Sequence, residues 1–512
     1  MKFALFTIIS LFFFSCSNKE PETQTNPIVE KDFCYSIHRN DSLSLSTELD
    51  SLNELLATKS GAYVLEDGGN SMIARAWLSE YAEKTIDVQY FIFSTDNVGL
   101  IACDYLVRAA DRGVKVRILV DDIMVDASAH DILMMDSHEN IDIKIYNPGI
   151  NLGKNIVEKL AKFKVDFVGA NQRMHNKTFT VDGKVVITGG RNIADEYFDY
   201  DHEYNFRDRD VLLLGKITKY IQSSFDIFWE SKLSVPVSNI VEDKTINAKD
   251  STRFNQLHQY ACNPENFWPQ VREKIKALPD VFKTINKSGD LVWMDSIQFI
   301  SDLPGKNDGT KGLSGGGILT DSLMSLVKRA KYSIDIQSPY LVTTELGRKL
   351  FADAVKRGVK VRILTNSLAS TDNLEAFSGY QRDRKELLET GIRVFEFRPD
   401  AKERFGIMTG ALQKAVDFKP IFGLHAKSMV IDGNITVVGT FNLDPRSANL
   451  NTECVIVMYS NKIAEGVLKG MEIEFGKDNS WETTKSFNPD GFAGEEKNKK
   501  VLKRKLVPKA IL

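Results

Sequence analysis

The sequence lacks a strong excess of basic charge. Its 512 residues include 66 lysines and arginines against 69 aspartates and glutamates, which gives a formal net charge of -3. A general nucleic-acid binder usually carries a clear basic excess or a basic face. The charge balance therefore argues against a nucleic-acid partner, although it leaves room for a local basic patch.

Cysteine is scarce as well. The chain has five cysteines, and they show none of the close pairing that is typical of a zinc site. Cys103 and Cys454 lie in apolar segments and are expected in the core. Cys34 and Cys262 could pair if the protein is exported, but sequence alone leaves this question open.

The N-terminus has an apolar run that is too short to span a bilayer comfortably. Residues 3–14 are apolar, follow Lys2 and precede Ser15-Cys16, which is the layout of an export signal. A small residue followed by cysteine resembles a bacterial lipobox, although Phe13 and Phe14 make the match looser. We therefore expect cleavage before Cys16, lipidation of that cysteine and anchoring in the bacterial cell envelope. An uncleaved anchor or a buried helix is the alternative.

The main feature of the sequence is an internal duplication. Residues 82–89 recur in similar form at 330–337, and residues 112–119 recur without change at 357–364. Each copy predicts a helix, a strand, a helix, an Arg-Gly turn, a strand, a long excursion and a hairpin. Residues 86–93 are apolar on both faces, as expected of a buried central strand, and residues 100–110 have helical spacing. We predict an α/β fold with helices covering a mixed sheet.

The duplication also predicts the division of the chain. We expect a lipoprotein-type signal peptide at 1–16, a polar tether at 17–58 and a first domain at 59–245. A connector with its own helix follows at 246–310, then a second domain at 311–485 and a basic tail at 486–512.

A short motif occurs once in each copy. His175-Asn176-Lys177 is followed by Asp182, and His425-Ala426-Lys427 is followed by Asp432. Histidine and lysine are two positions apart at a predicted strand, so their side chains emerge on one face. Each aspartate precedes a glycine in a predicted hairpin turn, and we interpret both aspartates as turn or supporting residues.

Further polar residues follow each motif. The returning strands end in small residues followed by Asn192 and Asn442, where the backbone could admit a phosphate and the amide could bind its oxygens. Asp210 and Glu453 open the next predicted strands. We expect these two acids to accept hydrogen bonds from the imidazoles and to fix their tautomers.

Together these residues predict a site for a phosphodiester. One imidazole can attack phosphorus while the other protonates the leaving oxygen, and Lys177 and Lys427 can stabilise the non-bridging oxygens. This scheme requires no metal or other cofactor, and lysine beside histidine argues against a metal cluster. A single His-x-Lys would more often be structural, but two matched copies reverse this expectation. The remaining histidines are expected to be structural or solvent-facing, namely His38, His130, His138, His202 and His258.

On these residues the chain resembles the phospholipase D superfamily, whose signature is two copies of His-x-Lys-x4-Asp. Segments such as 90–93, 120–122 and 189–193 look like the bacterial cardiolipin synthases of the C type. The resemblance implies two duplicated α/β/α sandwich domains with pseudo-two-fold symmetry and one shared active site. It also implies phosphatidyl transfer through a phosphohistidine, with His175 as nucleophile and His425 as general acid and then base.

Other functions stay open at this stage. The resemblance implies cardiolipin formation from phosphatidylglycerol and a second phospholipid, whereas a hydrolase would use the same residues with water as acceptor. A nuclease of the superfamily and an inactive scaffold are further alternatives. Phospholipids and a membrane surface are the expected partners. Residues 147–174 and 398–424 mix basic and apolar residues and could dip into lipid, or form ordinary half-buried helices. The basic tail could likewise bind anionic headgroups or be a solvated end.

Overall fold

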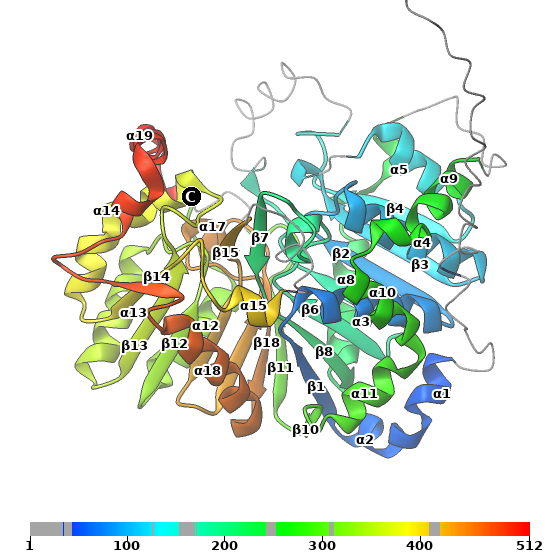
Figure 1. Cartoon of the computed structure of the whole chain (residues 1–512), viewed down its shortest axis with the longest axis horizontal. Helices are drawn as coiled ribbons and strands as arrows, with labels where there is room; N and C mark the ends of the chain where they lie inside the picture. The colour runs from blue at the N-terminus through cyan, green and yellow to red at the C-terminus, as the bar shows by residue number, and fades with distance from the viewer. Residues whose placement is uncertain are drawn as a thin grey trace, which may run out of the picture.

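The computed structural model describes residue 34 and residues 44–124, 127–152, 169, 171–241, 252–306, 312–408 and 420–512. Two β-sheets lie side by side, and helices cover them (Figure 1). Residues 1–16 of the predicted signal peptide, which include Cys16, lie outside the described residues, as does most of the predicted tether. The same holds for residues 153–168 and 170 of the first lipid-contact segment and for residues 409–419 of the second.

The first half of the chain builds most of a nine-stranded sheet with the order β10-β1-β8-β6-β5-β2-β3-β4-β9. β2, β3 and β4 are parallel, and their neighbours pair antiparallel. The strands are β1 (Ser60–Leu65), β2 (Thr85–Tyr90), β3 (Lys115–Asp121), β4 (Ile141–Tyr146), β5 (Thr178–Val181), β6 (Val185–Gly189), β8 (Asp210–Gly215), β9 (Ser234–Pro236) and β10 (Val292–Met294).

The second half builds an eight-stranded sheet with the order β11-β18-β17-β16-β12-β13-β14-β19. Its centre repeats the first sheet, since β12, β13, β14, β16, β17 and β18 take the places of β2, β3, β4, β5, β6 and β8. The strands are β11 (Ile297–Ser301), β12 (Ser333–Gln337), β13 (Lys360–Asn366), β14 (Arg393–Phe397), β16 (Ser428–Ile431), β17 (Ile435–Gly439), β18 (Cys454–Tyr459) and β19 (Ser480–Thr483).

Helices pack on both faces of each sheet. In the first half, α3 (Gly68–Tyr81) and α4 (Asn97–Asp111) pack on one face, and α8 (Thr218–Trp229) packs on the other. In the second half, α12 (Ile318–Arg329), α13 (Glu345–Lys356) and α14 (Leu374–Glu389) oppose α18 (Asn461–Phe475). The remaining helices are α1 (Leu45–Leu49), α2 (Asn53–Thr58), α5 (Ala129–Asp136), α9 (Thr252–Ala261), α10 (Pro269–Lys276), α11 (Val281–Lys287), α15 (Arg404–Ile407), α17 (Pro445–Asn449) and α19 (Gly494–Arg504).

Local signals in the duplicated units explain where their helices begin and end. Asp96 caps α4 by accepting from the Gly99 N–H, and Thr344 caps α13 in the same way through Gly347. Each helix is followed by a glycine with positive φ, Gly113 at 92° and Gly358 at 88°. The predicted central strand, helix, Arg-Gly turn and duplicated α/β architecture are therefore confirmed.

The segment predicted as a connector contributes more than a link. It contains α9, α10 and α11, so helix is present there as predicted, but as three short helices separated near Pro264, Pro269 and Pro279. Its β10 joins the edge of the first sheet, and β11 pairs with β18 in the second. The second sheet therefore includes residues that precede the predicted boundary at 311.

The two halves share one apolar core. Val186, Leu213 and Ile221 of the first half belong to the same buried cluster as Val438 and Ile456 of the second. A separate two-stranded sheet also joins the halves, because β7 (Tyr204–Arg207) pairs in parallel with β15 (Ile421–Leu424). In Figure 1 these two strands lie between the two large sheets. The halves therefore pack as one body.

The C-terminal region is folded onto the second half. α19 packs on α14 through Val501, which is buried, and the backbone of Leu512 and Ile511 accepts hydrogen bonds from Arg446. The predicted basic tail is therefore partly a packed helix. Within the described residues, we find no helix with the length and apolarity that a membrane crossing needs.

Candidate active site

Both histidine motifs lie immediately before the first strand of a hairpin. His175 to Lys177 precede β5, and His425 to Lys427 precede β16. All four side chains are buried, with residue exposures of 7% for His175, 1% for Lys177, 5% for His425 and 4% for Lys427. Buried polar side chains require hydrogen-bond or charge partners.

The motif aspartates lie at the far ends of these hairpins. Asp182 and Asp432 both have φ of 52°, in the hairpin turns. The Asp182 carboxylate accepts hydrogen bonds from the backbone N–H groups of Glu83, Lys84 and Thr85 at 2.7 to 2.9 Å. Asp432 does the same for residues 331–333. These contacts fix each hairpin to the neighbouring strand, which agrees with a supporting position.

Each imidazole contacts a carboxylate of the opposite half. His175 Nδ1 lies 2.8 Å from Glu453 Oε2, and His425 Nδ1 lies 2.6 Å from Asp208 Oδ2. With Nδ1 carrying the proton, Nε2 keeps its lone pair for chemistry. The contact predicted for Glu453 is present. Each histidine is thus oriented by an acid from the other copy.

The backbone interlocks at the same places. The His175 N–H donates to Thr452 O at 3.0 Å, and the His425 N–H donates to Arg207 O at 2.8 Å. In both cases the accepting residue directly precedes the orienting acid. The segments that carry the histidines are therefore held in register with the segments that carry the acids.

The prediction that Asp210 orients an imidazole was wrong. Its carboxylate instead accepts from Arg75 at 2.9 Å and from Ser71 Oγ at 2.6 Å. The strand register gives the reason: Gly189 pairs with Asp210, whereas Gly439 pairs with Val455. Asp210 therefore corresponds to Val455, and Asp208 is the counterpart of Glu453.

The small residues that end the returning strands make room for these acids. A Cβ on Gly190 would lie 2.1 Å from Asp208 Oδ1, and one on Gly189 would lie 2.3 Å from Asp210 Oδ1. A Cβ on Gly439 would lie 2.2 Å from the backbone oxygen of Cys454. Neighbouring protein groups are therefore sufficient to require small residues here, and access of a phosphate to this backbone stays a prediction.

The two lysines form a positive centre beside the imidazoles. Lys177 Nζ donates to His175 O at 3.0 Å, and Lys427 Nζ donates to His425 O at 2.6 Å. Lys427 Nζ also lies 3.0 Å from His425 Nε2 and 2.8 Å from Nδ1. Burial and the charge of Lys427 lower the pKa of Lys177 to about 7. Burial lowers the pKa of Lys427 to about 8. An anion between them would restore both charges.

The imidazoles are held neutral. Burial, opposed by Glu453, lowers the pKa of His175 to about 4. Burial and the neighbouring Lys427 lower the pKa of His425 to about 3. Burial opposes the ionisation of Glu453 and Asp208, but the adjacent histidines outweigh it. They hold the pKa of Glu453 below its usual value and that of Asp208 well below its usual value. The pairs therefore consist of a neutral imidazole and a carboxylate.

Each asparagine hydrogen-bonds to a residue that contacts one of the imidazole–carboxylate pairs. Asn192 Oδ1 accepts from the Ile92 N–H at 3.1 Å, and its Nδ2 donates to the Tyr197 hydroxyl at 2.8 Å. The backbone N–H of Asn442 donates to Ser447 Oγ, which itself donates to Glu453. Asn442 Oδ1 is buried and lacks a hydrogen-bond partner among the described residues. Phosphate binding by these amides stays a prediction.

Sequence reasoning missed several residues of this site. Asp208 is the main one, and only the pairing of Gly189 with Asp210 and of Gly439 with Val455 in the sheets shows that it corresponds to Glu453. The ring of Tyr197 packs on His425 with centroids 5.1 Å apart, and Phe91 packs on His175 at 5.0 Å. These aromatic contacts come from residues distant in sequence, so that no local pattern reveals them.

Potential metal ligands converge elsewhere. Among the described residues, Cys34, Asp104, His258 and Cys262 bring possible ligand atoms together. Cys34 and Cys262 form a disulfide, so the pairing left open above is present in the structure.

The family model described as "Cardiolipin synthase, PLD-like domain" matches residues 80–229 and 323–473. Cardiolipin synthase C of Escherichia coli is 32% identical over 82% of this chain and 86% of its own length. An "Uncharacterized protein" of Helicobacter pylori is 35% identical over 80% of this chain and 78% of its own. The crystal structure of phosphatidylserine synthase from Haemophilus influenzae matches the fold with a TM-score of 0.58 and 14% identity, over 91% of this chain and 100% of that chain.

The matched segments contain both histidine motifs and both orienting acids. The resemblance to the phospholipase D superfamily and the duplicated fold are thereby confirmed. The chain belongs to the cardiolipin synthase family of phospholipase D-like enzymes.

Proposed function

We propose that this protein is a phosphatidyltransferase that forms cardiolipin from phosphatidylglycerol and a second phospholipid. The observation that carries the proposal is the pair of imidazoles, each oriented by a carboxylate of the opposite half. The named relative in Escherichia coli supports this substrate class.

In the first step His175 Nε2 attacks the phosphorus of a phosphatidyl donor. A P–N bond forms, the P–O bond to the headgroup breaks, and His425 delivers a proton to the leaving oxygen. The two ammonium groups stabilise negative charge on the non-bridging oxygens. Because the anion raises the pKa of nearby groups, His425 can hold the required proton once the donor is bound.

The contacts of the two lysines support the choice of nucleophile. Both lysines donate to the backbone oxygen of their own histidine, and Lys427 in addition lies at hydrogen-bond distance from both ring nitrogens of His425. A hydrogen bond into its lone pair makes His425 the weaker nucleophile. Lys427 can also help to supply the proton. His175 therefore acts as nucleophile and His425 as acid and then base.

In the second step an alcohol replaces the headgroup. His425 removes the proton from the hydroxyl of phosphatidylglycerol, whose oxygen attacks phosphorus as the P–N bond breaks. Cardiolipin forms and His175 is regenerated. If water takes this place, the product is phosphatidic acid, which is the hydrolase alternative.

Membrane contact belongs to the same proposal. Leu502 and Leu506 are 58% and 90% exposed, and they lie among Lys499, Lys503 and Lys505 near the end of α19. Apolar side chains beside lysines suit an anionic lipid surface. Lipidation at Cys16 and a place in the bacterial envelope are part of the proposal, and Cys16 lies outside the described residues.

The test is incubation with labelled phosphatidylglycerol, alone and with phosphatidylethanolamine, in mixed micelles. Labelled cardiolipin is the expected product. Phosphatidic acid alone would favour the hydrolase, and cleavage of an oligonucleotide with no lipid product would favour a nuclease.

A further inference from the structure

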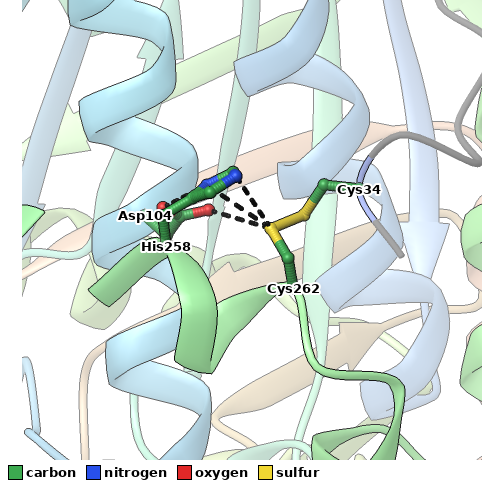
Figure 2. Close-up of side chains that lie close together, drawn as sticks. All are labelled: Cys34, Asp104, His258 and Cys262. Carbon is green, nitrogen blue, oxygen red and sulfur yellow. Dashed lines mark hydrogen bonds and ion pairs between the residues drawn. A yellow bond between two sulfur atoms is a disulfide. The ribbon is translucent and has the colours of Figure 1, made fainter. Parts of the chain in front are cut away.

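Four potential metal ligands meet on the outer side of the first half. His258 lies in α9, Cys262 directly follows that helix, Asp104 lies in α4, and Cys34 comes from the N-terminal segment (Figure 2). Their ligand atoms all lie within 4.8 Å of one another. None of these residues belongs to the histidine motifs or contacts them in the interactions described above.

The arrangement is built by two packed helices. His258 and Cys262 are four positions apart, so they lie on one face of a helical turn. That face turns toward α4, where Asp104 is 1% exposed. His258 Nδ1 lies 3.2 Å from Asp104 Oδ1, and Cys262 Sγ lies 3.4 Å from His258 Nδ1 and 3.8 Å from Asp104 Oδ2. Imidazole and carboxylate thus already face the sulfur.

We propose that the dithiol form of this cluster is a zinc site. Two sulfurs, one imidazole nitrogen and one carboxylate oxygen form a four-ligand set that suits tetrahedral Zn²⁺. The disulfide and the metal are then alternative ways to fasten Cys34 to α4 and α9.

The exchange between the two forms balances. A dithiol reductant transfers two electrons and two protons to the Cys34–Cys262 bond, which gives two thiols and an oxidised reductant. Zn²⁺ then displaces both thiol protons and forms two Zn–S bonds. His258 contributes a nitrogen lone pair, and Asp104 contributes one carboxylate oxygen.

The observed spacing suits the metal. Bond lengths of about 2.0 to 2.3 Å place the ligand atoms of tetrahedral zinc roughly 3.3 to 3.8 Å apart. The distances of His258 and Asp104 to Cys262 Sγ already fall near this range. Once the S–S bond is broken, rotation about the Cα–Cβ bonds separates the two sulfurs. Asp104 Oδ2 also accepts from Arg108 at 2.9 Å, which holds the carboxylate in place.

The test compares oxidised and reduced forms of the same full-length protein in detergent. One half of the sample is reduced anaerobically with a phosphine, and both halves receive ZnCl₂ before desalting and metal analysis. We expect about one zinc per chain in the reduced sample and less than about 0.1 in the oxidised one. When Co²⁺ is added in place of Zn²⁺, the reduced sample should show the visible absorption of a tetrahedral thiolate site.

Variants locate the metal. Cys262→Ser and His258→Ala should each weaken zinc binding about tenfold or more, whereas Cys103→Ser, which removes the free thiol beside Asp104, should leave it unchanged. Reduced wild-type protein without zinc would overturn the proposal. So would zinc that persists after both Cys34 and Cys262 are replaced by serine. The comparison of oxidised and reduced wild-type protein needs no variant, so a poorly folded variant cannot obscure the result.

Discussion

At the scale of single residues, the two imidazole–carboxylate pairs are the basis of the chemistry. His425 contacts Asp208 at 2.6 Å, and His175 contacts Glu453 at 2.8 Å. All four side chains are buried, so bulk water does not compete with the acids for the hydrogen bonds of the imidazoles. The nearby Asp210 has a structural role instead, since it forms a buried ion pair with Arg75.

Asp208→Asn and Asp210→Asn should therefore differ. An amide at 208 can no longer fix the His425 tautomer, and we expect kcat to fall by roughly 10²- to 10⁴-fold. An amide at 210 leaves buried Arg75 without its counter-charge and should destabilise the fold by about 3 kcal/mol or more. Lipid assays and thermal unfolding of both variants measure the two effects. A Asp210→Asn variant with normal stability and no activity would contradict this assignment.

The pH dependence of the free enzyme follows from His175 and the two lysines. His175 has a pKa lowered to about 4, so its Nε2 lone pair is available above that pH. The pKa values of Lys177 and Lys427 are lowered to about 7 and 8, so both lose charge as the pH rises. We expect kcat/KM, which reports the free enzyme, to fall below about pH 4 and again above about pH 7.

A variant tests the alkaline limb of this profile. Arginine stays protonated throughout, so Lys177→Arg should move the alkaline decline to higher pH even if the absolute rate falls. In the wild type, a kcat/KM that still increases between about pH 7 and 9 would contradict this explanation, since the two lysines lose their phosphate-binding charge over that range.

At the scale of elements, the returning strands β6 and β17 set where the acids lie. Gly190 allows Asp208 to approach so closely that a methyl group would be 2.1 Å from its carboxylate oxygen. Gly190→Ala should displace the acid from His425 and lower activity by about 10²-fold or more. Gly466→Ala in α18 is the matched control, because its Cβ would meet nothing within 4 Å.

The control variant should keep full activity and gain up to about 1 kcal/mol of stability, because alanine favours the helix. Steady-state assays and unfolding curves of the two variants provide the comparison. Equal activity in Gly190→Ala and Gly466→Ala would show that the close approach at Gly190 has no catalytic importance.

The helices and strands also show how much of the structure the sequence predicts. The paired strands, the helix before each Arg-Gly turn and the two hairpins could be predicted, because each depends on local periodicity and on a repeated pattern. Asp208 could not be assigned from such patterns. The segment between Asn192 and Asp208 is longer than the one between Asn442 and Glu453, so only the strand ladders show which acids correspond.

At the scale of the molecule, the active centre depends on the packing of both halves. Arg207 pairs with Glu474, and Arg209 donates to Gln337 and Ser428 at 2.6 and 2.7 Å. These two arginines flank Asp208 and fix it against the second half. A sequence can indicate two copies of a motif, but the contacts between copies come from tertiary packing.

The central claim is that one site uses both histidines, with His175 as nucleophile. The most direct measurement is acid-free rapid quenching with a labelled phosphatidyl donor, followed by mass mapping of the labelled peptide in wild type, His175→Ala and His425→Ala. The exposed His202 provides the control, as His202→Ala should behave like wild type.

The account predicts a phosphatidyl adduct on His175 in the wild type, none in His175→Ala, and formation slowed by about 10²-fold or more in His425→Ala. Cardiolipin formation should be lost in both variants. An adduct that forms at the normal rate without His425, or one that maps to His425 and survives removal of His175, would contradict it.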